Sequence, residues 1–229
     1  MHNIDSLLMK LGTDTSFDER FQILMNVVEY WHGAIQPNHG FQSHELERFE
    51  MPMAFRRWFT WAGRCETIMS GQNWFLHPSQ WIKKDGLILF QHENQGVFVW
   101  ATTGEGEDPF VFGRHEDSDP WQPQNIRVSE HLILNCLFEA VMCHAQFGAN
   151  CAWLDEPKVE WLRHRIPRIP LDGWTWGGKT EFFAGEERFM VTMTNGAPDV
   201  YSVWLGAKSQ PPLQSIKEII DDSWEYVAL

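Results

Sequence analysis

Apolar positions recur at the spacing of an α-helix in several stretches of the chain, most clearly over residues 17–32. Ser16 and Glu19 form a capping box just ahead of this stretch, and Gly33 follows its last apolar turn. The same spacing predicts the other helical segments, which are residues 3–11, a turn over 45–49, a helix from Pro52 to Gly63, a helix from Ser129 to Phe147, and a last helix from Pro212. Helices therefore open the chain, divide it in the middle and close it.

Shorter apolar runs bounded by turn residues predict the strands. Two of them, residues 87–91 and 96–102, flank a polar corner at 93–96, and residues 108–112 add a short edge strand. Three more form a meander and cover residues 180–184, 188–194 and 200–205. The Arg- and Pro-rich stretch 158–173 shows neither pattern, so we predict an irregular linker across the surface there.

The order of these elements favours an α+β fold, with a mainly antiparallel sheet flanked by helices and followed by a C-terminal β-meander and helix. A parallel sheet would need strands that alternate with helices, and the chain shows no such repeat. With 229 residues, 43% of them hydrophobic, the chain can bury a sizeable core. We predict a single domain over residues 1–229, in which residues 158–229 are either an extension or the second half of the sheet.

The charge balance limits the kinds of partner. The chain has 18 basic and 31 acidic residues, a net charge of −13, which disfavours nucleic acid because its phosphates are bound by Lys and Arg. The same charge suits a basic protein partner, although solubility is the simplest explanation of the charge taken alone. The chain has no basic leader before an apolar stretch, no run of 18 apolar residues and only four cysteines, so we expect a reduced, cytoplasmic protein that binds no membrane.

One stretch matches a catalytic pattern. Residues 173–180 fit the phosphate-loop pattern G-x-x-x-x-G-K-[ST], with Lys179 as the lysine. A phosphate loop leads from a buried strand into a helix, whereas prolines precede this match and a predicted strand follows it. An NTPase that uses Lys179 is therefore only a third hypothesis. The metal and nucleophile patterns H-E-x-x-H, C-x-x-C and G-x-S-x-G do not occur, so we expect no enzyme, no metal and no cofactor.

The chain contains 13 tryptophans, which is an unusual number. Most should lie in the core, because each buries a large apolar area. Trp174 and Trp176 alternate in a loop-like stretch, which leaves open that one of them is exposed. An exposed tryptophan suits a sugar platform or a protein interface, so a small-ligand or carbohydrate-binding protein is the second hypothesis for the function.

Three segments together resemble the SUKH superfamily, which joins a yeast cell-wall synthesis regulator with many bacterial toxin-immunity proteins. Residues 51–63 resemble the family's proline-opened helix that ends in glycine. Residues 87–100 resemble its two strands around a Glu-Asn-Gln-Gly corner, and residues 108–112 with Trp121 and the helix from Ser129 resemble its closing strand and helix. The resemblance is best over residues 45–147.

This resemblance implies an α+β domain without catalytic residues that acts by binding another protein. Bacterial members neutralise a cognate toxin, often a nuclease or deaminase, so the implied partner is a basic toxin domain whose active cleft is occluded. A general regulatory scaffold, as in the yeast branch, is the other implied function. The expected partner-binding residues belong to the corner and to acidic loops: Glu93, Asn94, Gln95, Glu105, Glu107, Asp108, Glu116, Asp117, Asp119 and Trp121. For the corner, a structural role is the alternative, because Asn94 and Gly96 suit a turn and Glu93 can cap it.

Overall fold

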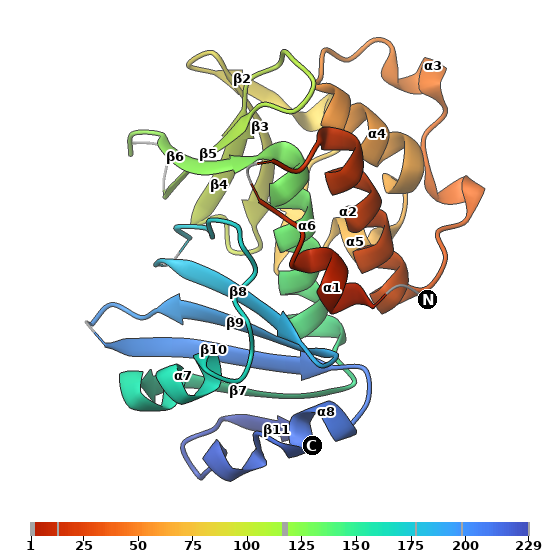
Figure 1. Cartoon of the computed structure of the whole chain (residues 1–229). Helices are drawn as coiled ribbons and strands as arrows, with labels where there is room; N and C mark the ends of the chain where they lie inside the picture. Colours follow the sequence, from red (N-terminus) through yellow and green to blue (C-terminus); the bar gives the residue numbers. More distant parts are fainter. Residues whose placement is uncertain (1–2, 13, 116–118, 177, 198, 229) are drawn as a thin grey trace. The chain divides into compact units, whose positions relative to one another are not determined.

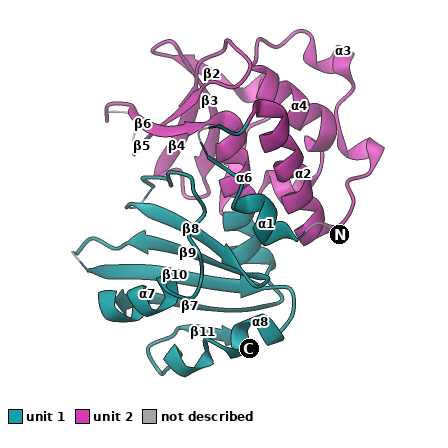
Figure 2. Cartoon of the chain, viewed as in Figure 1, with its two compact units in different colours: residues 1–15, 137–229 teal, residues 16–136 magenta. Residues whose placement is uncertain are grey.

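Helices and two antiparallel sheets make up the structure, a computed structural model that describes residues 3–12, 14–115, 119–176, 178–197 and 199–228. The predicted α+β class is therefore confirmed. The chain divides into two units. Unit 1 consists of residues 1–15 and 137–229, and unit 2 consists of residues 16–136 (Figure 2). Each unit contains one of the sheets, called sheet B in unit 1 and sheet A in unit 2.

Unit 2 contains sheet A and the helices that cover one of its faces (Figure 1). The helical segments are α2 (Phe17–His32), η1 (Pro37–His39), α3 (Ser43–Leu46), α4 (Met53–Ala62), α5 (Glu66–Met69), η2 (Pro78–Gln80) and most of α6 (Val128–Glu139). The strands are β1 (Asn73–Phe75), β2 (Ile82–Lys84), β3 (Leu87–Glu93), β4 (Phe98–Thr102), β5 (Phe110–His115) and β6 (Gln122–Arg127). Their order is β1-β3-β4-β5-β6, with β2 also paired to β3. The predicted edge strand at 108–112 is wrong, because β5 lies between β4 and β6.

Helix α2 begins at the predicted capping box. Ser16 Oγ accepts a hydrogen bond from the Glu19 N–H at 3.3 Å, and the Glu19 carboxylate accepts one from the Ser16 N–H at 2.9 Å. The helix ends at Gly33, whose φ of +80° favours glycine and whose N–H donates to the Glu29 carbonyl. The two ends of α2 thus follow from local side-chain and backbone chemistry.

Helices α4 and α6 pack on the same face of sheet A. Phe55 of α4 lies against Phe90 of β3, with ring centroids 4.6 Å apart. Helix α6 adds polar contacts, since His131 Nε2 lies 2.5 Å from Gln91 Oε1 and Gln91 Nε2 donates to Asn135 Oδ1 at 2.8 Å. All five side chains are buried, so this network fixes how α6 sits on the sheet.

A β-bulge decides which side chains of β3 face the helices. The register passes from Leu89 opposite Ala101 to Gln91 opposite Trp100, so Phe90 is the extra residue. Phe90 and Gln91 are both buried, and the alternation then continues one residue out of step. Glu93 consequently points into the covered face and is only 1% exposed.

Unit 1 contains sheet B, whose described strands follow the order β11-β7-β10-β9-β8. They are β7 (Phe147–Asp155), β8 (Thr180–Gly185), β9 (Arg188–Thr194), β10 (Val200–Ala207) and β11 (Tyr226–Ala228). The helical segments are α1 (Ile4–Leu8), the π-helical turn η3 (Ala140–His144), α7 (Glu156–Arg163), α8 (Pro211–Gln214) and η4 (Lys217–Ile219). The predicted meander is confirmed, and it belongs to a separate sheet rather than to a second half of sheet A.

Two predicted helices end earlier than expected. The helix from Ser129 does not reach Phe147: α6 ends at Glu139, η3 continues to His144, and β7 begins at Phe147. Gly148, expected to follow a helix, lies inside β7, where a Cβ would come within 2.6 Å of the Leu205 carbonyl oxygen. The helix expected from Pro212 is reduced to the short segments α8 and η4.

The predicted surface linker over residues 158–173 is also wrong. Its first part belongs to α7, which Asp155 caps by accepting from the Lys158 N–H at 3.0 Å. Its second part runs along the outer edge of β8, where the Ile169 N–H donates to the Phe182 carbonyl at 2.8 Å. Ile169 is buried, so this stretch closes the edge of sheet B.

Candidate functional site

The corner at 93–96 is a tight turn. The Gly96 N–H donates to the Glu93 carbonyl at 2.8 Å, and Gly96 has a φ of +75°. The Glu93 carboxylate accepts from the Gln95 N–H and from Gln72 Nε2, each at 2.8 Å. The buried Glu93 carboxylate therefore stabilises the turn. Among residues 93–96, only the side chains of Asn94 and Gln95 are exposed.

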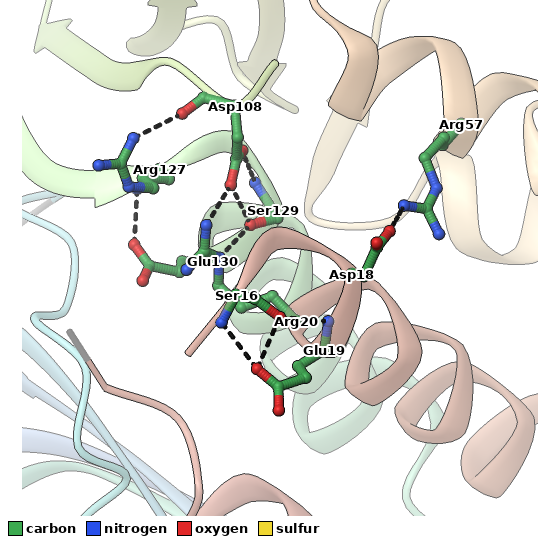
Figure 3. Close-up of polar contacts among 9 residues, drawn as sticks. All are labelled: Ser16, Asp18, Glu19, Arg20, Arg57, Asp108, Arg127, Ser129 and Glu130. Atoms are coloured by element: carbon green, nitrogen blue, oxygen red, sulfur yellow. Dashed lines mark hydrogen bonds and ion pairs between the residues drawn. The ribbon is translucent and has the colours of Figure 1, made fainter. Parts of the chain in front are cut away.

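Asp108 lies inside unit 2, although the sequence suggested an exposed loop (Figure 3). Its carboxylate accepts from Arg20 Nη2 at 2.8 Å, from the Ser129 N–H at 2.8 Å and from Ser129 Oγ at 2.6 Å. The Arg20 and Asp108 side chains are only 7% and 4% exposed. The pair thus joins α2 to the start of α6, and Asp108 is unsuited to contact a partner.

Glu105 and Glu107 are the exposed acidic residues of the loop between β4 and β5, called the acidic loop here for residues 103–107. The loop is fixed by the first N–H groups of α4, which have no partner within their own helix. The Met53 N–H donates to the Gly106 carbonyl at 3.3 Å, and the Ala54 N–H donates to the Glu107 carbonyl at 2.9 Å. The two carboxylates are therefore carried by an ordered backbone.

The remaining predicted residues belong to the connection between β5 and β6. Trp121 is half-buried, and the Arg114 guanidinium lies 4.1 Å from its ring centroid. Asp119 is exposed. Glu116 and Asp117 lie outside the described residues, so their prediction is unchanged.

The face of sheet A that α4 and α6 leave uncovered carries an apolar row. Residues directly opposite each other on antiparallel strands share a face. The register therefore aligns one row across five strands: Ile82, Leu89, Ala101, Phe112 and Pro123. We call this surface, together with its neighbours Trp74 and Phe110, the open face.

Three large apolar side chains of the open face are well exposed. Ile82 is 55% exposed, Phe110 is 48% exposed and Trp74 is 46% exposed. Phe110 begins β5, three residues after Glu107 of the acidic loop. The Arg127 guanidinium lies 4.7 Å from the Phe110 ring centroid, and the His92 ring lies 5.6 Å from Trp74, so both aromatics are supported from one side. The open face therefore lies next to the two carboxylates of the acidic loop.

A hollow of about 530 Å³ lies at the end of sheet A beside the acidic loop. Its lining includes Glu105 from the loop, Glu50, and Lys83 of β2, and Lys83 pairs with Glu50. A basic side chain of a partner could enter there next to two carboxylates. Strand β2 was not predicted, although Asp85 and Gly86, which follow it, are typical of a hairpin turn between two strands.

The alternative chemistries find little support in the geometry. Thr180 begins strand β8 and not a helix, so the phosphate-loop match lacks its helix N-terminus. Its glycines serve close backbone packing: a Cβ on Gly173 would lie 1.5 Å from the Thr180 carbonyl oxygen, and one on Gly178 2.2 Å from that of Thr194. Trp174 is fully buried and Trp176 is half-buried, so of the two only Trp176 is accessible to a sugar.

Neither a metal centre nor a membrane span is found in the described part of the chain. No group of three or more His, Cys, Asp or Glu side chains is placed to hold a metal ion among those residues. No described helix is both long and apolar enough to cross a bilayer. Comparisons with protein-family models, with curated proteins and with solved structures gave no match.

Proposed function

We propose that this chain is a SUKH-like protein-binding module of the immunity type, which neutralises a basic toxin domain by occluding it. The observation that carries the proposal is the set of exposed apolar side chains Ile82, Phe110 and Trp74 on the open face, beside an anchored acidic loop. The resemblance of residues 45–147 to the SUKH superfamily supports it independently. No cofactor or catalytic step is required, since occlusion of an active cleft is a binding event.

The open face supplies the surface that a partner would desolvate. Large apolar side chains that are half exposed are costly in water, and aromatic residues are enriched among those that dominate binding energy. Ile82, Phe110 and Trp74 have this character. Each would contribute on the order of 1–2 kcal/mol when fully covered.

The acidic loop supplies charge recognition. Glu105 and Glu107 are exposed, and neither carboxylate makes a hydrogen bond or ion pair with another described residue. Their charges would attract a cationic surface and set its orientation before the apolar row is covered. In place of the predicted Glu93 and Asp108, the proposed contact set therefore contains Ile82, Phe110 and Trp74.

Co-expression with the products of neighbouring genes, each expressed singly, tests the proposal. We expect a one-to-one complex with one toxic product and restored growth. Ile82→Asp should abolish the complex and the restored growth, because it places a charge in the apolar row. Val227→Asp should leave the complex and the restored growth unchanged. Val227 is the matched control, since it is 46% exposed and lies in unit 1.

Two results would overturn the proposal. If no neighbouring product is toxic or bound, the immunity function fails and a regulatory scaffold becomes the better hypothesis. If a complex forms and Ile82→Asp leaves it intact while both variants stay folded, the open face is not the interface.

A further inference from the structure

Three cations of unit 1 surround one carboxylate at the end of sheet B. Arg163 Nη2 lies 2.8 Å from Glu181 Oε2, while Lys179 Nζ and Arg168 Nε lie 3.2 Å and 3.3 Å from Glu181 Oε1. Arg163 belongs to α7, Arg168 to the stretch along the β8 edge, and Lys179 directly precedes β8. Segments distant in sequence thus bring positive charge to one place.

These groups line a hollow of about 410 Å³. The rest of its lining consists of Phe183, Thr194 and Tyr201. The size is within the range of small-molecule sites, which is about 300–1,000 Å³, and it exceeds what an isolated inorganic anion would fill. An aromatic ring, a phenol and a hydroxyl beside cations suit an organic molecule that carries an anionic group.

The side chains that line the hollow carry a net charge opposite in sign to that of the whole chain. Three cations and one carboxylate line the hollow, whereas acidic residues outnumber basic ones 31 to 18 in the sequence. Arg163 is also paired with Glu156 and Glu160, at 3.2 Å and 2.6 Å, so its charge is already balanced. The two cations left for a ligand are Arg168 and Lys179.

Arg168 and Lys179 share a single oxygen of Glu181 and keep further donors. An ammonium has three N–H donors and a guanidinium has five. Arg168 uses Nε for Glu181 and Nη2 for the Leu171 carbonyl at 3.1 Å. The Lys179 side chain is 68% exposed, and its ammonium pairs with Glu181. A second anion can therefore be bound without any loss of the present contacts.

We propose that this hollow binds the phosphate group of a phosphorylated small molecule. A phosphate dianion offers three acceptor oxygens to the donors of Arg168 and Lys179, and charge-assisted bonds of this kind are the strongest hydrogen bonds in proteins. Glu181 holds the cations together and opposes the ligand by its own charge. The site differs from a phosphate loop, because side-chain cations bind the anion and no helix N-terminus takes part.

Calorimetric titration of the whole chain with phenyl phosphate and with inorganic phosphate tests the inference. We expect saturable one-to-one binding of phenyl phosphate that is tighter than that of inorganic phosphate. Lys179→Gln should weaken it roughly tenfold or more, the loss of one charge-assisted contact. Lys217→Gln, which removes an exposed cation elsewhere in unit 1, should leave it unchanged. Glu181→Gln should strengthen it, because an opposing charge is removed.

The outcomes separate the possible sources of binding. Equal affinity for both probes would show that the hollow does not recognise the organic part of the ligand. If the wild type binds neither probe, the hollow is not a phosphate site. An equal loss in Lys179→Gln and Lys217→Gln would also overturn the site, since net charge alone would explain the result. Thermal unfolding of Lys179→Gln should match the wild type, which keeps the test valid.

Discussion

A single buried histidine makes the stability of unit 2 sensitive to acid. His131 of α6 is fully buried against β3, and its Nε2 lies 2.5 Å from Gln91 Oε1. Burial lowers the pKa of His131 from 6.5 to about 3, because the charged ring would lose its hydration. The unfolded chain takes up the proton below pH 6.5 while the folded chain does not. This group therefore favours folding above pH 6.5, and that contribution is lost as the pH falls towards 3.

We expect His131→Gln to flatten this pH dependence. The variant should be less stable than the wild type near neutral pH, because the packing of the imidazole is lost. Below pH 6.5 the difference should shrink by up to about 1.4 kcal/mol per pH unit. Urea unfolding of both proteins between neutral pH and about pH 4 measures it. Parallel curves for the two proteins would mean that the ring is not held neutral.

Two ion pairs of unit 2 should differ sharply in their contribution to stability. Arg20 and Asp108 are buried, whereas Asp18 of the Asp18–Arg57 pair is 83% exposed (Figure 3). Asp108→Ala leaves the Arg20 charge buried without its carboxylate, which should cost about 3–5 kcal/mol. Asp18→Ala is the matched control and should cost less than about 1 kcal/mol. Chemical denaturation would contradict this ranking if both variants lost the same stability.

The burial of single residues decides which of the expected site residues could be predicted from the sequence. Asn94, Gln95, Glu105 and Glu107 are exposed as the sequence suggested, because polar loop residues remain in water. Glu93 is buried, because the bulge at Phe90 shifts the alternation of buried and exposed side chains in β3. The sequence of β3 does not indicate this bulge. Asp108 is buried because of a partner 88 positions away, which local sequence cannot reveal.

Helices and strands whose ends are set by neighbouring residues could be predicted from the sequence. The capping box of α2 and the turns of the β8–β10 meander are contained in a few neighbouring residues, so both elements were predicted. Strand β7 was missed, because its residues Phe147–Asp155 lack clear alternation and are held by pairing with β10 and β11. Helix α7 had a start signal in Asp155 and Pro157, which the prolines further along obscured.

The hairpin between β8 and β9 offers a stabilising change. Glu186 and Glu187 form its two-residue turn with φ of 54° and 60°, a conformation that favours Asn-Gly. Glu187→Gly should raise stability by about 0.5–1 kcal/mol, since glycine adopts positive φ without a steric cost. Gly196→Ala, at a φ of +63°, should act in the opposite direction. Thermal unfolding of both variants checks the two signs, and a fall in the melting temperature of Glu187→Gly would refute the argument.

For the whole molecule, the net charge of −13 has a kinetic consequence. If the partner is basic, association should be fast at low salt and slow as salt screens the charges, with a screening length of about 10 Å at 0.1 M. Glu105→Lys with Glu107→Lys should lower the association rate constant roughly tenfold or more at low salt. Stopped-flow mixing with the partner isolated in the co-expression test measures this rate.

The matched control for this experiment is Glu29→Lys with Glu66→Lys. Both residues are exposed on helices of unit 2, and the net charge changes equally. An equal loss of rate in both double variants would show that total charge, and not the acidic loop, steers the encounter.

The edges of strands β8 and β2 bear on self-association. The outer edge of β8 is closed by the stretch around Ile169, whereas β2 is exposed along its full length and carries Lys83 and Lys84. Charged lysines on an open edge repel a second copy of the same strand, so they act as gatekeepers against fibrous aggregation. Replacing both by valine would create an uncharged β-branched edge next to Ile82. Concentrated solutions of that variant should scatter light where the natural chain stays clear.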